Sequence, residues 1–192
     1  MNVVDHIRQN FELYGFASKE GGIWQIIREL VENAKDAIHK LVASEVNIGS
    51  IQTSDLCIKI IMKNEHYEPN GVQIEIFDNG LGMDDPLKCI TCFSSLRASN
   101  LLCMSVEEKQ DYSSISMCTN DLPSLVGKYG IGLSACVLYS QLESHRSTRI
   151  ITRTLDRRDT VVADFEFDLE TGKPVIIQSK SVLSKPWVGT KM

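Results

Sequence analysis

The sequence of 192 residues predicts an α+β fold, with a mixed, mostly antiparallel sheet and helices on one face. One observation is a long run, residues 21–43, whose apolar positions follow a helical period without proline. The other is the order of the elements, because several strand-like runs follow two helical ones. The strand-like runs are residues 56–62, 72–77, 148–154, 161–167, 174–180 and 187–192.

The composition is that of an ordinary globular domain, and we expect residues 1–192 to form a single domain. The chain has 43% hydrophobic residues and a net charge of -5, which argues against a large nucleic-acid surface on this segment. No apolar run is long enough to span a bilayer, and the N-terminus lacks the pattern of a signal peptide. We therefore expect no membrane contact and an intracellular location, nuclear if the source is eukaryotic and otherwise cytoplasmic.

The helix predicted at residues 21–43 carries a polar stripe. Glu29, Asn33 and Asp36 fall within about 60° of one another around its axis. The stripe borders the apolar arc, which is the position of a cleft wall. The alternative is an ordinary exposed face, and the stripe alone favours neither interpretation.

Residues 56–62 and 72–77 are predicted to pair as a hairpin, because Pro69, Asn70 and Gly71 between them are strong turn formers. The second strand leads into FDNGLGM, residues 77–83, which places Asp78 where the strand ends. Considered alone, Asp-Asn-Gly is more simply explained as a turn.

A second glycine-containing stretch, GKYGIGLSACVLYSQ at residues 127–141, is expected to begin a helix. Unpaired N–H groups at such an end can bind an anion, although a structural glycine turn would explain three glycines equally well. It is neither a P-loop nor a dinucleotide fingerprint, because Tyr129 follows Lys128 and a long polar loop, not a strand, precedes the glycines.

The motifs together, and in this order, resemble the gyrase, heat-shock chaperone, histidine kinase and MutL ATPase superfamily, whose fold is the Bergerat-type ATP-binding sandwich. They are Glu29-x-x-x-Asn33-x-x-Asp36, Asp78-x-Gly80-x-Gly82, Gly127-x-x-Gly130-x-Gly132 and Gly189-Thr190. Within this superfamily, the chain most resembles the B subunit of topoisomerase VI. That resemblance rests on the flanking stretches RQNFELYGF, IRELVENAKDAI and GKYGIGLSACVLYSQ.

The resemblance implies a role for each polar residue. Glu29 would be the general base that activates the water attacking the terminal phosphate. Asn33 would give its side-chain oxygen to Mg²⁺, and Asp36 would act as a nearby acceptor that fixes Asn33 or a strand end. Asp78 would accept a hydrogen bond from the adenine amino group, with Thr190 supporting the same end of the base. The other implied nucleotide contacts are Gly80, Gly82, Met83, Gly127, Lys128, Gly130 and Gly132.

The resemblance also implies an organisation and partners. Residues 1–20 would form an N-terminal strap and residues 98–126 a mobile ATP lid. We expect the transducer domain, which follows in the B subunit of topoisomerase VI, to be absent from these 192 residues. The function would be ATP-driven dimer closure and DNA strand passage, as an ATPase subunit of a type II topoisomerase. Its partners would be a DNA-cleaving A-type subunit, double-stranded DNA and a second copy in a nucleotide-dependent homodimer.

Without a transducer domain, we expect the 192 residues to bind ATP and Mg²⁺ but to hydrolyse ATP slowly. Two alternatives stay open. One is another ATPase of the superfamily, MORC-like or MutL-like, and the other is a non-catalytic scaffold of the meiotic DNA-break machinery with the same fold.

Overall fold

The computed structural model describes residues 3–45, 56–64, 71–91, 130–183 and 187–192. Its strands form one six-stranded sheet in the order β1-β2-β6-β3-β4-β5, and every strand pair in the described residues is antiparallel. The strands are β1 (Ile58–Asn64), β2 (Val72–Asp78), β3 (Thr148–Arg153), β4 (Asp159–Phe167), β5 (Pro174–Leu183) and β6 (Gly189–Lys191). The predicted α+β class and its antiparallel pairing are confirmed.

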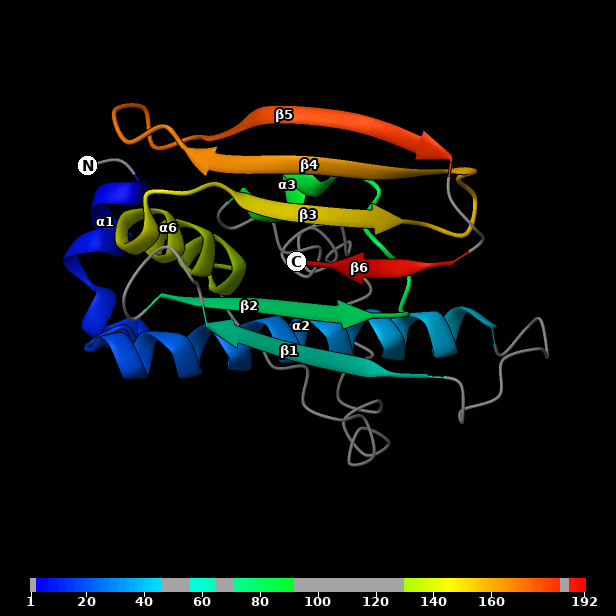
Figure 1. Cartoon of the computed structure of the whole chain (residues 1–192), viewed down its shortest axis with the longest axis horizontal. Helices are drawn as coiled ribbons and strands as arrows, with labels where there is room; N and C mark the ends of the chain where they lie inside the picture. The colour runs from blue at the N-terminus through cyan, green and yellow to red at the C-terminus, as the bar shows by residue number, and fades with distance from the viewer. Residues whose placement is uncertain (1–2, 46–55, 65–70, 92–129, 184–186) are drawn as a thin grey trace, which may run out of the picture.

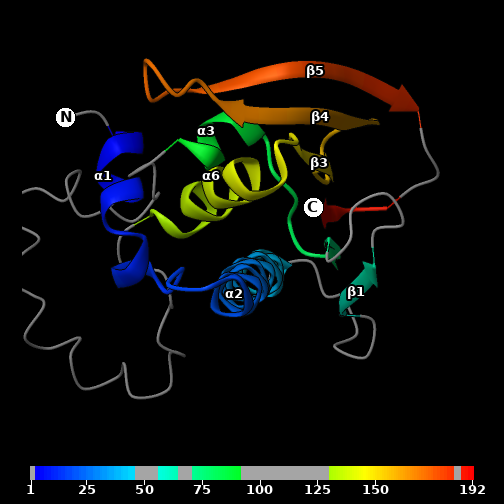
Figure 2. The ribbon, with the colours of Figure 1, turned by 60° about the vertical axis from the view of Figure 1, so that its left-hand side comes forward.

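The helices gather on one face of this sheet, as predicted, and leave the other face open (Figures 1 and 2). They are α1 (Val3–Gln9), a short 3-10 helix (Phe11–Tyr14), α2 (Lys19–Glu45), α3 (Pro86–Ile90) and α6 (Gly132–Ser144). None of the helices in the described part of the chain is long and apolar enough to span a bilayer.

Helix α2 begins two residues earlier than the sequence pattern predicts, because Ser18 caps it. The Ser18 side chain accepts a hydrogen bond from the Gly21 N–H at 3.0 Å, and its carbonyl accepts one from Gly22 at 2.7 Å. These bonds satisfy N–H groups that a helix start leaves without partners. The helix then runs along β1 and β2 on the helix-covered side of the sheet (Figure 1).

The core lies between α6 and the strands β3 and β4. Ala135, Cys136, Val137 and Leu138 of α6 are buried there, against strand residues that include Phe165. The N-terminal segment closes one end of this core, where the rings of Phe11 and Phe16 contact Tyr139 at centroid distances of 5.5 and 4.6 Å. Residues 3–16 are therefore part of the folded core in this structure.

The predicted hairpin is confirmed by the pairing of β1 with β2, in which Ile58 is opposite Asp78 and Asn64 is opposite Val72. Side chains of Ile74, Ile76 and Asp78 share the helix-facing side of β2, as the alternation predicts. Beyond this hairpin, β2 pairs with β6, where Asp78 is opposite Thr190. Asp78 is thus placed at the junction of β2, β6 and the helix layer.

Candidate functional site

A hollow lies between α2 and the ends of β2 and β6. Four residues of α2 form one wall, and strand ends and the loop after β2 form the other. The lining residues are Leu30, Asn33, Ala34, Ala37, Ile76, Asp78, Gly82, Met83, Thr190 and Met192. Five of the residues predicted to bind nucleotide, from three separate stretches of sequence, are therefore brought together here.

Asp78 is the ionisable group of this hollow. Asp78 is only 6% exposed to solvent, and its Oδ1 accepts a hydrogen bond from the Gly80 N–H at 2.9 Å. Burial raises the pKa of the Asp78 carboxyl to about 6, while hydrogen bonds from the backbone of Gly80 and Thr190 act in the opposite direction. At pH 7 the carboxyl is mostly ionised, so it presents an acceptor without a donor to whatever enters the hollow.

The buried hydroxyl of Thr152 on β3 makes hydrogen bonds that connect the loop after β2 with β6. Its Oγ1 accepts a hydrogen bond from the Met83 N–H at 2.8 Å and donates one to the Gly189 carbonyl at 3.1 Å. The Thr190 Oγ1 lies 3.2 Å from the same atom. Since the Thr152 proton is used on Gly189, Thr190 is the donor in this contact, and its own oxygen is left as an acceptor.

The glycines of the Asp-x-Gly-x-Gly stretch are required by packing. A Cβ on Gly80 would lie 2.6 Å from the Ala37 carbonyl carbon of α2, and the next residue, Leu81, donates its N–H to the Ala37 carbonyl at 3.3 Å. Gly82 has a φ of +77° and lies against the Arg153 carbonyl, where a Cβ would collide with backbone. This loop therefore clamps α2 to the sheet, a role that adds to the one implied by the resemblance.

The three residues of the polar stripe on α2 have different surroundings. Asn33 is exposed and lines the hollow. Asp36 is half-buried and is not among the lining residues. Glu29, one turn before Asn33, lies against Gly132 at the start of α6 and is not among the lining residues. Only Asn33 of the three is thus part of the hollow.

Glu29 is held between α2 and α6. The Gln25 side chain donates a hydrogen bond to its Oε1 at 2.7 Å, and its Oε2 occupies the space that a Cβ on Gly132 would need. Burial is the main cause that raises the pKa of Glu29, partly offset by the charge of Arg28. A carboxyl with a raised pKa beside a helix N-terminus has the properties of a proton acceptor.

The glycine-containing stretch before α6 is described only in part. Gly130 has a φ of +64°, which favours glycine, and Gly132 is the first residue of α6. Gly127, Lys128 and the predicted lid at residues 98–126 lie outside the described residues. Their predicted contacts with phosphate stay predictions.

Sequence reasoning missed Thr152 and Gln25. Thr152 lies two residues after the buried Ile150 on β3 and so shares its face of the sheet, which is a signal for a polar residue placed inside the fold. Gln25 lies four residues before Glu29, the spacing at which side chains meet on a helix. Neither signal was specific enough to identify a contact without the positions of β6 and α6.

Metal binding by protein side chains alone has no support here. Among the described residues there is no group of three or more His, Cys, Asp or Glu that could hold a metal ion. A Mg²⁺ ion bound through nucleotide phosphates needs fewer protein ligands, and the exposed amide oxygen of Asn33 on the hollow wall fits that requirement.

The architecture is that expected of a Bergerat-type sandwich, with an antiparallel sheet, helices on one face and a hollow between α2 and the sheet. The comparison with curated proteins confirms the more specific resemblance, which is to the B subunit of type 2 DNA topoisomerase 6. The B subunit from Sulfurisphaera tokodaii is 26% identical over 191 residues, and that from Metallosphaera sedula is 27% identical over 180 residues.

The matched segments cover 98% and 93% of this chain but 30% and 28% of these relatives, so the chain spans less than a third of their length. No protein-family model matches the chain. Among solved structures, the N-terminal domain of a DNA repair protein is similar with a TM-score of 0.43 and 19% identity, covering 99% of this chain and 40% of that one.

Proposed function

We propose that this chain is the ATP-binding and ATPase domain of a protein like the B subunit of topoisomerase VI. The observation that carries the proposal is the pair of buried acceptors, Asp78 and Thr190, at one end of a hollow whose α2 wall leads through Asn33 towards Glu29. The similarity to topoisomerase 6 B subunits over nearly the whole chain supports it.

The Asp78 end suits the amino group of adenine. That group carries two hydrogens, and both the Asp78 carboxylate and the Thr190 oxygen accept hydrogen bonds. Guanine presents a carbonyl at the same position and would face two acceptors without a donor. The apolar side chains of Leu30, Ile76 and Met83 offer a surface for the faces of the base.

The opposite end suits the phosphates and the attacking water. Along α2, Ala37, Asn33 and Glu29 follow one another at intervals of one helical turn, about 6 Å. When Mg-ATP is bound, Asn33 would hold the metal, which neutralises phosphate charge. Glu29 would take a proton from the attacking water, and N–H groups at the start of α6 would contact phosphate oxygens.

The function of the whole protein follows from the relatives and is part of the proposal. A protein of this kind would work with a DNA-cleaving A-type subunit on double-stranded DNA and would dimerise when nucleotide binds. Hydrolysis by the 192 residues alone would be slow, because the resemblance assigns a phosphate-contacting lysine to the transducer domain.

The test is calorimetric binding of a non-hydrolysable ATP analogue with and without Mg²⁺. Loss of one hydrogen bond to a charged group costs roughly 1.5–3 kcal/mol, so Asp78→Asn should weaken binding by about 10- to 100-fold. Asn33→Ala should remove the dependence on Mg²⁺. Matched controls are Asp84→Asn and Asn64→Ala, the same changes at exposed positions outside the hollow.

Folding of each protein is checked by its thermal transition before titration. No Mg²⁺-dependent binding by a folded wild-type protein would overturn the proposal and favour the non-catalytic scaffold. Equal affinity for ATP and GTP analogues would overturn the role of Asp78 and Thr190 in selecting adenine.

A further inference from the structure

The open face of the sheet carries a row of side chains that crosses all six strands. Residues opposite one another in paired strands share a face of the sheet, so the strand register identifies the row. This cross-strand row consists, from β1 to β5, of Lys59, Phe77, Lys191, Ile151, Val162 and Lys180. It lies on the open face because Ile76 and Asp78, the neighbours of Phe77 along β2, are on the helix-facing side.

Three of the six side chains in the cross-strand row are lysines, and none is acidic. Neighbouring strands lie about 4.8 Å apart, so the backbone of Lys191 is about 10 Å from that of Lys59 and about 14 Å from that of Lys180. Lys59 and Lys180 are exposed. The row is therefore a line of positive charge across the full width of the sheet.

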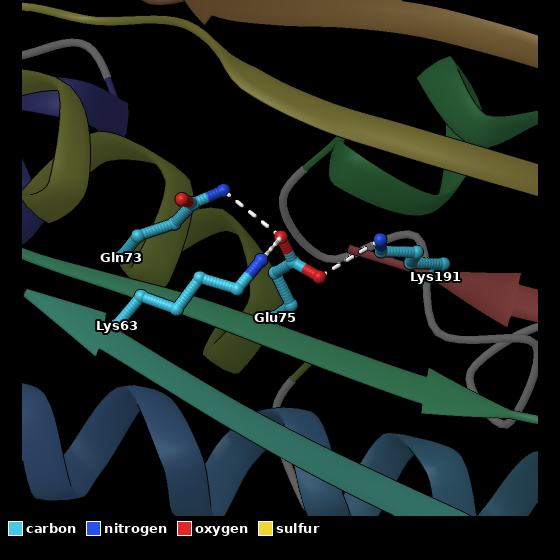
Figure 3. A network of polar contacts seen from close by, with 4 residues as sticks. All are labelled: Lys63, Gln73, Glu75 and Lys191. Atoms are coloured by element: carbon cyan, nitrogen blue, oxygen red, sulfur yellow. Dashed lines mark hydrogen bonds and ion pairs between the residues drawn. The ribbon is translucent and has the colours of Figure 1, made fainter.

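The acids beside the cross-strand row are already paired with bases. Glu75 lies 2.8 Å from the Nζ of Lys191 and 3.1 Å from the Nζ of Lys63 (Figure 3). Asp164 accepts two hydrogen bonds from Arg149, at 2.7 and 2.8 Å. One carboxylate shared by two lysines and another matched by an arginine do not cancel the charge of the row.

The open face as a whole is basic, although the chain is acidic. Alternation along the described strands places six basic and three acidic side chains on this face, a net charge of +3, against -5 for the chain. They are Lys59, Lys63, Arg149, Arg153, Lys180 and Lys191, and Glu75, Asp164 and Glu166. The net charge that argues against a nucleic-acid surface therefore conceals an uneven distribution.

An aromatic pair lies within this basic face. The ring of Trp187 is 5.7 Å from the ring of Phe77, centroid to centroid, and both residues are half-buried. Phe77 lies directly between Lys59 of β1 and Lys191 of β6. A partly exposed aromatic surface is thus flanked by two cations.

Phosphates and aromatic faces together are what a single-stranded nucleic acid presents. Its bases stack on aromatic side chains while its backbone follows Lys and Arg, and some RNA-binding domains hold single strands in this way on an open sheet. A duplex keeps its bases stacked within itself and would leave the rings of Phe77 and Trp187 unused. An acidic peptide would match the charge but would offer no bases to stack.

We propose that the cross-strand row binds a single-stranded nucleic acid, with phosphates at Lys59, Lys191 and Lys180 and a base on the rings of Phe77 and Trp187. This site lies on the opposite side of the sheet from the hollow that contains Asp78. It is therefore separate from the proposed nucleotide site.

The first experiment measures binding of a fluorescent oligodeoxythymidine by anisotropy at several salt concentrations, with a strand of about 12 nucleotides. Three phosphate contacts to a single strand predict that the logarithm of the affinity falls with the logarithm of salt with a slope of about -2. The double variant Lys59→Gln/Lys180→Gln should reduce the slope to about -0.7 and weaken binding by about 25-fold at about 0.1 M salt. ATP is absent throughout, so the result is independent of the proposed function.

The matched control is Lys35→Gln/Lys40→Gln, which removes the same charge from exposed positions of α2 in the helix layer. It should bind the oligonucleotide within about twofold of wild type, because the removed charges lie far from the contacted phosphates. The thermal transition of each variant checks that it is folded. Oligouridine of the same length distinguishes RNA from DNA as the preferred strand.

The second experiment locates the site by tryptophan fluorescence. The chain has two tryptophans, Trp187 beside the cross-strand row and Trp24 on α2, which is 71% exposed. In Trp24→Phe, the oligonucleotide should quench the fluorescence of the remaining Trp187, because a base stacks on its ring. In Trp187→Phe, the fluorescence of Trp24 should not change.

The proposal has several ways to fail. No binding by the folded wild-type protein, or equal loss of affinity in the two double-lysine variants, would overturn it. A duplex of the same length that bound as tightly as the single strand would overturn the role of the aromatic pair. Binding of polyglutamate without binding of either oligonucleotide would overturn the proposal and assign the row to an acidic polypeptide.

Discussion

Two acids, Asp78 and Glu29, lie in different parts of the site and are held in different ways. Asp78 is fixed by the backbone of β2 and β6 and by the glycine loop beneath α2. Glu29 is placed by one side-chain hydrogen bond from Gln25 and by the absence of a side chain at Gly132. The end of the site proposed to bind adenine, here called the adenine end, is therefore part of the sheet, whereas the end proposed to be catalytic, here called the catalytic end, depends on side chains between two helices. Changes at Asp78 should alter stability and binding together, and changes near Glu29 should alter hydrolysis alone.

The largest effect is expected for Glu29→Gln, which keeps the size of the side chain and removes the carboxylate proposed to act as the base. General-base catalysis contributes about 10²- to 10⁴-fold, so the rate of ATP hydrolysis should fall by at least about 10²-fold. Binding of the non-hydrolysable analogue should change little. Single-turnover hydrolysis measures the first effect and calorimetry the second.

Glu32→Gln, one turn away on the same helix, is the control for this substitution. It removes the ion pair with Lys35 and a charge that contributes less than burial to the raised pKa of Glu29, while the Glu29 carboxyl itself stays in place. If both variants hydrolysed ATP at the wild-type rate, Glu29 would not be the base, and the division between the two ends would be wrong.

The next effect concerns stability and pH at the adenine end. The pKa of Asp78 is about 6 in the folded protein, raised from 3.8, so the folded state holds the proton more tightly than the unfolded state. Folding stability from this group is therefore lost as pH rises from about 4 to 6, and the cost of the buried charge at pH 7 is up to about 3 kcal/mol.

Asp78→Asn cannot ionise, so its free energy of unfolding relative to wild type should rise by up to about 3 kcal/mol between pH 4 and pH 7. Urea denaturation at several pH values measures this difference, with Asp84→Asn as the control. A difference that did not change with pH would contradict the raised pKa. If the Asp78 carboxylate also binds the nucleotide, as proposed, the gain in stability should accompany a loss of nucleotide affinity.

Sequence patterns predicted most of this fold because its elements obey local rules. The helix at residues 21–43 and the hairpin ending at Asp78 follow apolar periods of 3.6 and 2 residues, and both are present within two residues of the predicted ends. The predicted strands at residues 148–154 and 161–167 also correspond to β3 and β4. Such patterns indicate which face of a helix or strand is buried, and this information is sufficient to predict the fold class.

The candidate site was predictable only in part, since contacts between distant elements leave weak local signals. Asp78 and Thr190 could be assigned from motifs, but the hydrogen bond from Met83 to Thr152 joins residues 69 positions apart. The packing of Gly80 under Ala37 likewise depends on the position of α2 over the sheet. Periodicity identified the polar stripe of α2 without showing that its members have different surroundings.

The smallest effects distinguish two glycines that differ in their neighbours. A Cβ on Gly80 would meet the backbone of α2, 2.6 Å from the Ala37 carbonyl carbon, so Gly80→Ala should cost roughly 1–3 kcal/mol of stability. A Cβ on Gly132 would meet the end of the Glu29 side chain, which can turn away. Alanine also favours the helix that Gly132 begins, so Gly132→Ala should leave the stability within about 1 kcal/mol of wild type.

The rate of ATP hydrolysis should be affected in the opposite order, with Gly132→Ala losing more than Gly80→Ala. Gly132→Ala must displace the Glu29 carboxylate, and a misplacement of about 1 Å can cost up to about 10²-fold in rate. Urea denaturation and single-turnover hydrolysis on the same two variants therefore compare the two ends directly, with each variant as the control for the other. If Gly132→Ala were destabilised as much as Gly80→Ala while hydrolysing ATP normally, the carboxylate would not be held by the space above Gly132. The catalytic end would then be as rigid a part of the fold as the adenine end.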